Sequence, residues 1–149
     1  LRQMLGHDFL IVLIGVNDKQ IENLPKGILG IKRTNSIQEL VRYYSIADVF
    51  LNPTWEDNFP TTNLEALACG TPVITYRTGG SIEAVDESTG FVVEQGDLES
   101  LIAKINIIKR LGKVAYRTNC RARAVRLYDK KIRYNEYMQL YKELLKDRK

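Results

Sequence analysis

Two carboxylates, Asp57 and Glu65, flank the expected start of a helix near the middle of the chain. Pro60 suits the first position of that helix, because it has no amide to leave unpaired and its φ is preset. The backbone amides of Thr61 and Thr62 would then point out of the helix N-terminus, where phosphate and other anions bind. Glu65 follows Thr61 by four residues and Thr62 by three, so its carboxylate shares their face of the helix.

Glu65 stands in an otherwise apolar helical stretch, and a carboxylate in such surroundings needs a hydrogen-bonding partner. A vicinal diol such as that of a ribose would satisfy it. Asp57 lies just outside the helix and can accept hydrogen bonds from sugar hydroxyls. The simpler alternatives are a solvated helix residue for Glu65 and a turn-forming aspartate for Asp57.

Short apolar runs that alternate with helical patterns predict the scaffold that positions these carboxylates. The runs are Phe9–Ile14, Ile28–Ile31, Asp48–Leu51, Pro72–Thr75 and Gly90–Val93. Their alternation with helices implies right-handed crossovers and an α/β fold with an open, parallel, Rossmann-like sheet. The continuous run at 9–14 is typical of a strand buried on both faces. Ligands of such folds bind beyond the carboxyl ends of the strands, which is where the carboxylates and turn residues collect.

Capping patterns predict where several helices begin. Ser36 and Glu39 form the S-x-x-E pattern of a capping box. Asp97 is suited to capping a later helix. Near the C-terminus, one helical face collects Tyr137, Leu140, Tyr141 and Leu144. We therefore expect one domain over residues 1–149, with the basic helices of the tail, about 97–149, packed on its end as part of the same domain.

Charge is divided unevenly along the chain. Residues 1–100 carry 7 Lys or Arg and 14 Asp or Glu, whereas residues 101–149 carry 15 and 4. The net charge of +4 therefore combines an acidic part of −7 with a basic tail of +11. One interpretation of the tail is solvated helix faces, and the other is attraction to an anionic membrane surface. The tail lacks the exposed aromatic pattern of a nucleic-acid binder, so no nucleic-acid partner is expected.

Composition and missing motifs exclude several other classes of protein. The chain is 44% hydrophobic and 27% charged, as in ordinary globular proteins, and no apolar run is long enough to span a bilayer. The few cysteines and the single histidine do not form a disulfide framework or a zinc site, so a reducing, cytoplasmic location is expected. Nucleotide-binding G-x-G-x-x-G and P-loop motifs and the G-x-S-x-G elbow are missing. Asp-x-Asp is missing too, so neither a metal nor a cofactor is expected.

The stretch Asn52–Glu83 resembles the donor-binding core of glycosyltransferase family 4, whose members are retaining enzymes of the GT-B fold. Seven residues separate Asp57 from Glu65, as in that family, and the run EALACGTPVI begins at Glu65. The run GGSIE completes the pattern at residues 79–83. The resemblance extends over roughly residues 9–145.

This resemblance implies a role for each matching residue. Asp57, or the adjacent Glu56, would contact hydroxyls of the donor sugar, and Glu65 would hold the ribose. Backbone amides that meet sugar and phosphate would be those of Asn58, Phe59, Thr61 and Thr62. Residues near the nucleobase would be Ile31, Lys32, Arg33, Gly15 and Val16. A supporting loop would be formed by Gly79, Gly80 and Glu83. The family needs no protein nucleophile, so no catalytic residue is named in this chain.

Several features depart from the family pattern. Asp57 stands where glutamate is usual and is one methylene shorter. Asn58 and Pro60 replace the usual glycines, and Gly15-Val16-Asn17 replaces a Gly-x-Gly. The family's Arg and Lys that neutralise the pyrophosphate, and its acceptor-binding N-terminal domain, would precede residue 1.

The resemblance therefore implies a retaining transfer of sugar from a nucleotide-diphosphate sugar to a glycan or lipid-linked acceptor. This chain would be the N-terminally truncated donor-binding part, inactive when isolated. It would act in the cytoplasm, peripheral to the inner face of the membrane if the basic tail binds anionic lipid. The alternatives are a nucleotide-sugar epimerase-like protein of the GT-B fold and a non-enzymatic nucleotide-binding module.

Overall fold

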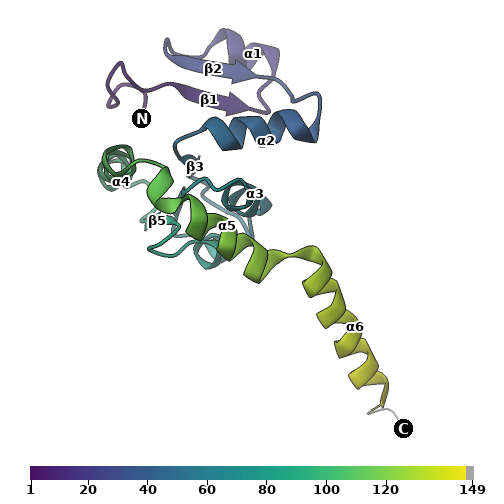
Figure 1. Cartoon of the computed structure of the whole chain (residues 1–149). Coiled ribbons are helices and arrows are strands. Elements are labelled where there is room, and N and C mark those ends of the chain that lie inside the picture. Colours follow the sequence, from purple (N-terminus) through teal and green to yellow (C-terminus); the bar gives the residue numbers. More distant parts are fainter. Residues whose placement is uncertain (147–149) are drawn as a thin grey trace.

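The computed structural model describes residues 1–146 and shows parallel strands flanked by helices (Figure 1). The strands are β1 (Ile11–Ile14), β2 (Ile28–Ile31), β3 (Phe50–Asn52), β4 (Val73–Tyr76) and β5 (Gly90–Val93). The helices are α1 (Asp18–Glu22), α2 (Ile37–Ile46), α3 (Thr61–Ala68), the 3-10 helix η1 (Gly79–Ala84), α4 (Leu98–Leu111), α5 (Val114–Tyr128) and α6 (Lys130–Lys146). The expected α/β fold class is confirmed.

The strands form two parallel sheets, and the expectation of one open sheet is wrong. In the first sheet β1 pairs with β2, from Ile11 opposite Ile28 to Ile14 opposite Ile31. In the second sheet β4 lies between β3 and β5. Apolar runs reveal that strands alternate with helices, but they do not specify which strands become hydrogen-bonded neighbours.

The first strand differs from its prediction in burial. Val12, Leu13 and Ile14 are 37–39% exposed, although their continuous apolar run predicted burial on both faces. The reason is that β1 belongs to a sheet of only two strands, against which the short helix α1 packs at β2. Such a sheet lacks the helices on both faces that bury the strands of larger parallel sheets.

The hydrophobic core surrounds the second sheet. β4 is buried along its whole length, α4 contacts β4 and β5, and α3 packs against α5. The largest apolar side chains that are fully buried are Leu67, Ile74, Leu101 and Ile108. Cys120 of α5 is buried in the same core, and burial raises the pKa of its thiol to about 12. The thiol is therefore protonated and acts as a small packing residue.

Two of the predicted caps are present, but one capping box is incomplete. Asp97 accepts a hydrogen bond from Ser100 N at 2.9 Å, and Ser36 accepts one from Glu39 N at 3.1 Å. The Glu39 carboxylate, however, accepts from the amide of Asn35 at 2.6 Å and not from that of Ser36. Asn35 precedes the cap residue, so the carboxylate reaches one residue further back than the pattern predicts.

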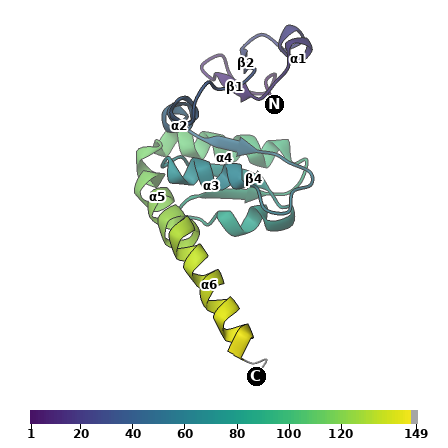
Figure 2. The same cartoon turned by 90° about the vertical axis from the view of Figure 1, so that its right-hand side faces the viewer.

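The last helix, α6, extends away from the rest of the molecule (Figures 1 and 2). Asp129, between α5 and α6, has extended backbone and redirects the chain outward. The apolar face that was expected to pack on the domain is therefore exposed, at Tyr137, Leu140, Tyr141 and Leu144. None of the helices in the described part of the chain combines the length and hydropathy that crossing a bilayer requires.

Candidate functional site

The loop of residues 53–60, here called the acid loop, connects β3 to α3 and carries Glu56 and Asp57. One carboxylate oxygen of Asp57, Oδ1, accepts a hydrogen bond from Phe59 N at 3.0 Å. This contact fixes the turn and occupies the Phe59 amide, which was expected to face a ligand. Asp57 is half-buried, whereas Glu56 is exposed. Asp57 is therefore the better fixed of the two carboxylates that were assigned to the donor sugar.

Two glycines at the start of η1 support the acid loop through direct backbone contact. Gly80 N donates to the carbonyl oxygen of Asn58 at 2.8 Å. A Cβ atom on Gly79 would lie 2.0 Å from the Asp57 carbonyl oxygen, and one on Gly80 would lie 2.3 Å from that of Asn58. Gly79 also has φ +40°, in the left-handed region. The predicted supporting loop thus holds the acid loop at a distance that only glycine permits.

The N-terminus of α3 opens beside the acid loop. Pro60 is the N-cap and not the first helical residue that the sequence suggested, and its carbonyl oxygen accepts from Asn63 N at 3.1 Å. Among residues 1–146, no acceptor pairs with the amides of Thr61 and Thr62. The first turn holds no acidic residue. Two free amides and the positive end of the helix dipole therefore favour an anion at this position.

Two buried polar atoms near this helix start also lack partners within the described chain. They are Nδ2 of Asn63 in α3 and Oγ of Ser81 in η1. The opposite end of the Asn63 amide is occupied, since its Oδ1 accepts from Asn52 Nδ2 at 2.9 Å. Buried polar groups are normally hydrogen-bonded, so these two atoms are exceptions within the described residues. Neither atom could be recognised from the sequence, because burial of a single polar side chain leaves no local pattern.

Glu65 has a partner that the sequence did not reveal. The hydroxyl of Tyr44 in α2 donates to Glu65 Oε2 at 3.1 Å. Burial, reinforced by the Glu65 charge, raises the pKa of Tyr44, so the hydroxyl remains protonated and remains a donor. The Phe50 ring packs edge-on against Tyr44, with 5.4 Å between ring centroids. The hydrogen bond from Tyr44 to one carboxylate oxygen thus orients Glu65, and the side chain remains exposed to solvent.

Lys113 fixes the helix that carries Tyr44. Its Nζ donates to the carbonyl oxygens of Tyr44, Ser45 and Ala47 at 3.2, 2.7 and 2.9 Å. These carbonyls lie at the C-terminal end of α2, where backbone acceptors lack intrahelical partners. Burial lowers the pKa of Lys113. The ammonium at the start of α5 therefore helps to position the tyrosine that orients Glu65.

The residues assigned to the nucleobase gather at the carboxyl ends of β1 and β2. Gly15 N and Val16 N both donate to the Ile31 carbonyl oxygen, at 2.9 and 3.4 Å. Lys32 forms an ion pair with Asp18 of α1. Arg33 is exposed. This group belongs to the first sheet and the acid loop to the second, so the structure assembles each group separately and not on one sheet edge.

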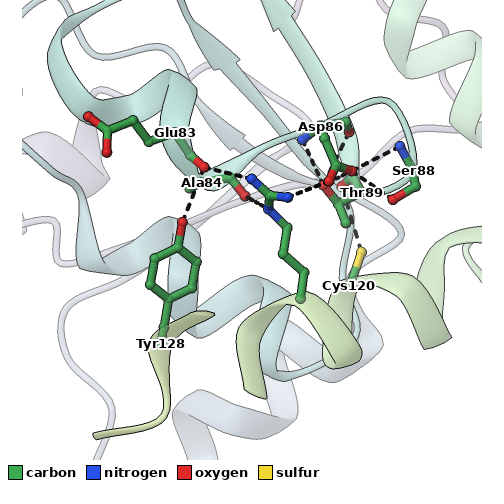
Figure 3. Close-up of polar contacts among 8 residues, drawn as sticks. Glu83, Ala84, Asp86, Ser88, Thr89, Cys120 and Tyr128 are labelled. Atoms are coloured by element: carbon green, nitrogen blue, oxygen red, sulfur yellow. Dashed lines mark hydrogen bonds and ion pairs between the residues drawn. The ribbon is translucent and has the colours of Figure 1, made fainter. Parts of the chain in front are cut away.

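The supporting helix η1 is anchored to α5 by a polar cluster (Figure 3). Arg123 donates to the carbonyl oxygens of Glu83 and Ala84, both at 2.8 Å, and forms an ion pair with Asp86. Tyr128 adds a hydrogen bond from its hydroxyl to the Glu83 carbonyl oxygen at 3.1 Å. The Glu83 carboxylate points away from this cluster in Figure 3. Glu83 therefore contributes to the support through its backbone.

This parallel α/β fold, with carboxylates and free helix amides at a carboxyl edge, has the architecture of the GT-B glycosyltransferases. A sucrose-phosphate synthase from Thermosynechococcus elongatus superposes with a TM-score of 0.76 and 28% identity, over 91% of this chain and 38% of that one. A structure of Anabaena Alr3699/HepE in complex with UDP-glucose has a TM-score of 0.69 and 24% identity, over 84% of this chain and 35% of that one.

The family model described as "Glycosyl transferases group 1" matches residues 1–109, and the chain belongs to that family. Among curated relatives, the capsular polysaccharide biosynthesis glycosyltransferase CapM of Staphylococcus aureus is 30% identical over 116 residues. That match includes 74% of this chain and 30% of CapM. The chain thus spans less than two fifths of the length of each of these proteins.

Proposed function

We propose that this chain is the donor-binding part of a retaining glycosyltransferase of family 4, which transfers sugar from a nucleotide diphosphate to a glycan or lipid-linked acceptor. The observation that carries the proposal is the free N-terminus of α3, with Glu65 on that helix and the glycine-backed acid loop beside it. The UDP-glucose named for HepE and the polysaccharide named for CapM agree with such a donor and acceptor. All of residues 1–149, with the tail from about 97, belong to the proposed domain.

In this proposal each group has one task. The α3 amides and helix dipole stabilise the negative charge of the diphosphate, which increases as the sugar leaves. Glu65 accepts hydrogen bonds from the ribose diol, and Asp57 or Glu56 accepts from sugar hydroxyls. No side chain of this chain acts as a nucleophile, and no metal is needed. The Arg and Lys that neutralise the pyrophosphate, together with the acceptor site, belong to the rest of a longer enzyme.

The Glu65→Ala substitution should weaken nucleotide binding by about 10- to 100-fold, because a hydrogen bond to a charged group contributes about 1.5–3 kcal/mol. Isothermal titration of the chain with UDP and with GDP measures this change. The exposed Glu143 of α6 provides the matched control, since Glu143→Ala removes the same charge away from the site. A nucleotide without the ribose hydroxyls, such as 2′,3′-dideoxy-UDP, should bind the unsubstituted chain more weakly than UDP does. The Glu65→Ala variant should bind the two nucleotides almost equally.

If Glu65→Ala and Glu143→Ala bind nucleotide equally well, the ribose assignment is wrong. If neither UDP nor GDP shifts the amide resonances of residues 61–65 in the unsubstituted chain, the donor-site proposal itself is wrong. The two results are separable, because the second does not depend on any substitution.

We also propose that the protein lies in the cytoplasm and contacts the anionic inner face of the membrane through α6. The helix exposes a stripe of six large side chains. They are Tyr134, Tyr137, Met138, Tyr141, Leu144 and Leu145. Tyrosine is suited to the membrane–water interface because its ring is apolar and its hydroxyl polar. The net charge of +11 over residues 101–149 would attract anionic headgroups.

Co-sedimentation with vesicles tests this contact. We expect the chain to pellet with phosphatidylcholine vesicles that contain phosphatidylglycerol, and not with phosphatidylcholine alone. Lys142→Glu with Lys146→Glu should weaken this binding at least fivefold, since each basic residue near the surface contributes about 1 kcal/mol. Ile37→Ser, which removes an exposed apolar side chain from α2, is the control. Equal pelleting with both vesicle types would exclude the charge-dependent contact.

A further inference from the structure

Trp55 of the acid loop is exposed and nevertheless held in a fixed position. The residue is 64% exposed. Its carbonyl oxygen accepts hydrogen bonds from Thr78 Oγ1 at 2.9 Å and from Gln95 Nε2 at 2.7 Å. These donors belong to the segments that follow β4 and β5, so the connections after all three strands of the second sheet converge on this residue.

The indole ring is also supported on its benzo edge. The Tyr76 ring lies against it with 6.1 Å between centroids and an interplanar angle of 73°. A Cβ atom on Gly96 would lie 3.3 Å from Cη2 of the indole, so the backbone there approaches the ring closely. Gly96 has φ +78°, in the left-handed region that glycine adopts readily. The rest of the ring faces solvent at the carboxyl edge of the sheet.

The hydrogen bonds that anchor residue 55 do not require a tryptophan at this position. The two hydrogen bonds that anchor residue 55 use its carbonyl oxygen, which any amino acid would supply. Tryptophan is highly buried on average, because its large apolar area is its main contribution to stability. The exposure of Trp55 places its ring outside the hydrophobic core.

Exposed polar groups come from the same two segments. Arg77 Nε and Glu94 Oε1 form an ion pair of 2.6 Å, and both side chains are solvent-accessible. A pyranose ring offers the complementary chemistry: an apolar face of C–H groups surrounded by hydroxyls. The aromatic ring receives the apolar face, and the charged groups exchange hydrogen bonds with the hydroxyls. Because the indole is already fixed, little conformational entropy is lost on binding.

We propose that Trp55 is a stacking platform for a pyranose ring, and that Arg77 and Glu94 hydrogen-bond to hydroxyls of the same sugar. This inference rests on the proposed function, since Trp55 precedes the sugar-binding candidate Asp57 by two residues. The stacked ring belongs either to the sugar carried by the nucleotide or to the acceptor glycan. The chemistry is the same in both cases, and the experiment distinguishes the two sources.

Trp55 is the only tryptophan in the chain, so its indole N–H gives one resolved signal in a proton–nitrogen correlation spectrum. The chain is titrated separately with UDP, UDP-glucose, GDP-mannose and maltotetraose. The amides of Thr61 and Thr62 are followed in the same spectra. A donor sugar on the platform shifts the indole with a nucleotide sugar and not with UDP. An acceptor glycan on the platform shifts the indole with maltotetraose.

Failure of the stacking platform and failure of the proposed function give different spectra. An indole signal that stays fixed in all four titrations, while the amides of Thr61 and Thr62 shift, overturns the platform and leaves the proposed function intact. A shift of equal size with UDP alone also overturns it, because the ring would then stack on the base. Signals that stay fixed at all three residues overturn the proposed function, and the platform with it.

Two variants separate stacking from structural support. Trp55→Phe keeps an aromatic face and should retain affinity for the sugar that shifts the indole, within about threefold. Trp55→Ala should weaken that affinity by about tenfold, equivalent to about 1.4 kcal/mol. Leu111→Ala, which removes an exposed apolar side chain from α4, is the control. If both Trp55 variants lose affinity and thermal stability together, the residue supports the loop and the platform is excluded.

Discussion

Gly79→Ala should weaken nucleotide-sugar binding by about 100-fold, the order of cost that a misplacement of about 1 Å has in a positioned site. The new Cβ would lie 2.0 Å from the Asp57 carbonyl oxygen, so the acid loop has to move. The substitution also places a side chain at φ +40°, and strain of this kind costs about 1–3 kcal/mol. Titration calorimetry with UDP-glucose and thermal unfolding measure the two effects.

Gly112→Ala is the matched control for this substitution. Gly112 also has a positive φ, of +78°, but a Cβ atom there would meet nothing within 4 Å. It lies between α4 and α5, away from the acid loop. Both variants should lose stability through backbone strain, and only Gly79→Ala should lose affinity. Equal affinities for the two variants would show that the acid loop does not depend on contact with η1.

Arg123→Ala should lower the free energy of unfolding by about 3 kcal/mol, because it removes the cationic partner of the partly buried Asp86 carboxylate and one hydrogen bond to each of two carbonyl oxygens. The Arg123 side chain is 15% exposed. It donates hydrogen bonds to the carbonyl oxygens of Glu83 and Ala84 and forms an ion pair with Asp86. Urea denaturation followed by circular dichroism measures the loss. Arg126→Ala on the same helix is the control, since Arg126 is exposed and its loss should cost at most about 0.5 kcal/mol.

The same cluster predicts how stability depends on pH. Burial alone would raise the pKa of Asp86, but hydrogen bonds from Ser88 and Thr89 and the charge of Arg123 lower it below 3.8. A lowered folded-state pKa stabilises the protein above the unfolded pKa, and this contribution is lost as the pH falls through the folded pKa. Stability should therefore fall below about pH 4, and less steeply in Arg123→Ala. If the stability of the unsubstituted chain and that of Arg123→Ala fall equally steeply as the pH is lowered, this role of Asp86 is wrong.

Features that depend on neighbours in the sequence were predictable. Asp97 caps α4 because its side chain reaches an amide three residues ahead, and such short-range contacts have a recognisable pattern. The strand at Gly90–Val93 was predicted with its observed bounds, because an apolar run bounded by turn residues is also local. The glycines at 79 and 80 belonged to a recognisable motif, although the motif did not reveal that Asp57 and Asn58 lie against them.

Features that depend on residues far apart in the chain were not predictable. Tyr44 and Glu65 are separated by 21 positions, and no local pattern around either residue indicates that the two are in contact. The division into two sheets depends on which strands are neighbours in space, and alternating helices and strands are compatible with either arrangement. The shift of Pro60 to the N-cap is a difference of one residue, within the variation of helix ends.

The division into two sheets has a consequence for the choice of nucleotide. The groups proposed for base and diphosphate belong to different sheets, and within residues 1–146 no strand hydrogen bonds join the two sheets. The spacing between the two groups depends on α2, whose end is tied to Lys113 and whose Tyr44 contacts Glu65. In the proposed enzyme, a change in the length or anchorage of this one helix would therefore alter which base fits, and would leave the acid loop unchanged. In the proposed enzyme, selection of the base and binding of the sugar would then depend on separate parts of the donor site.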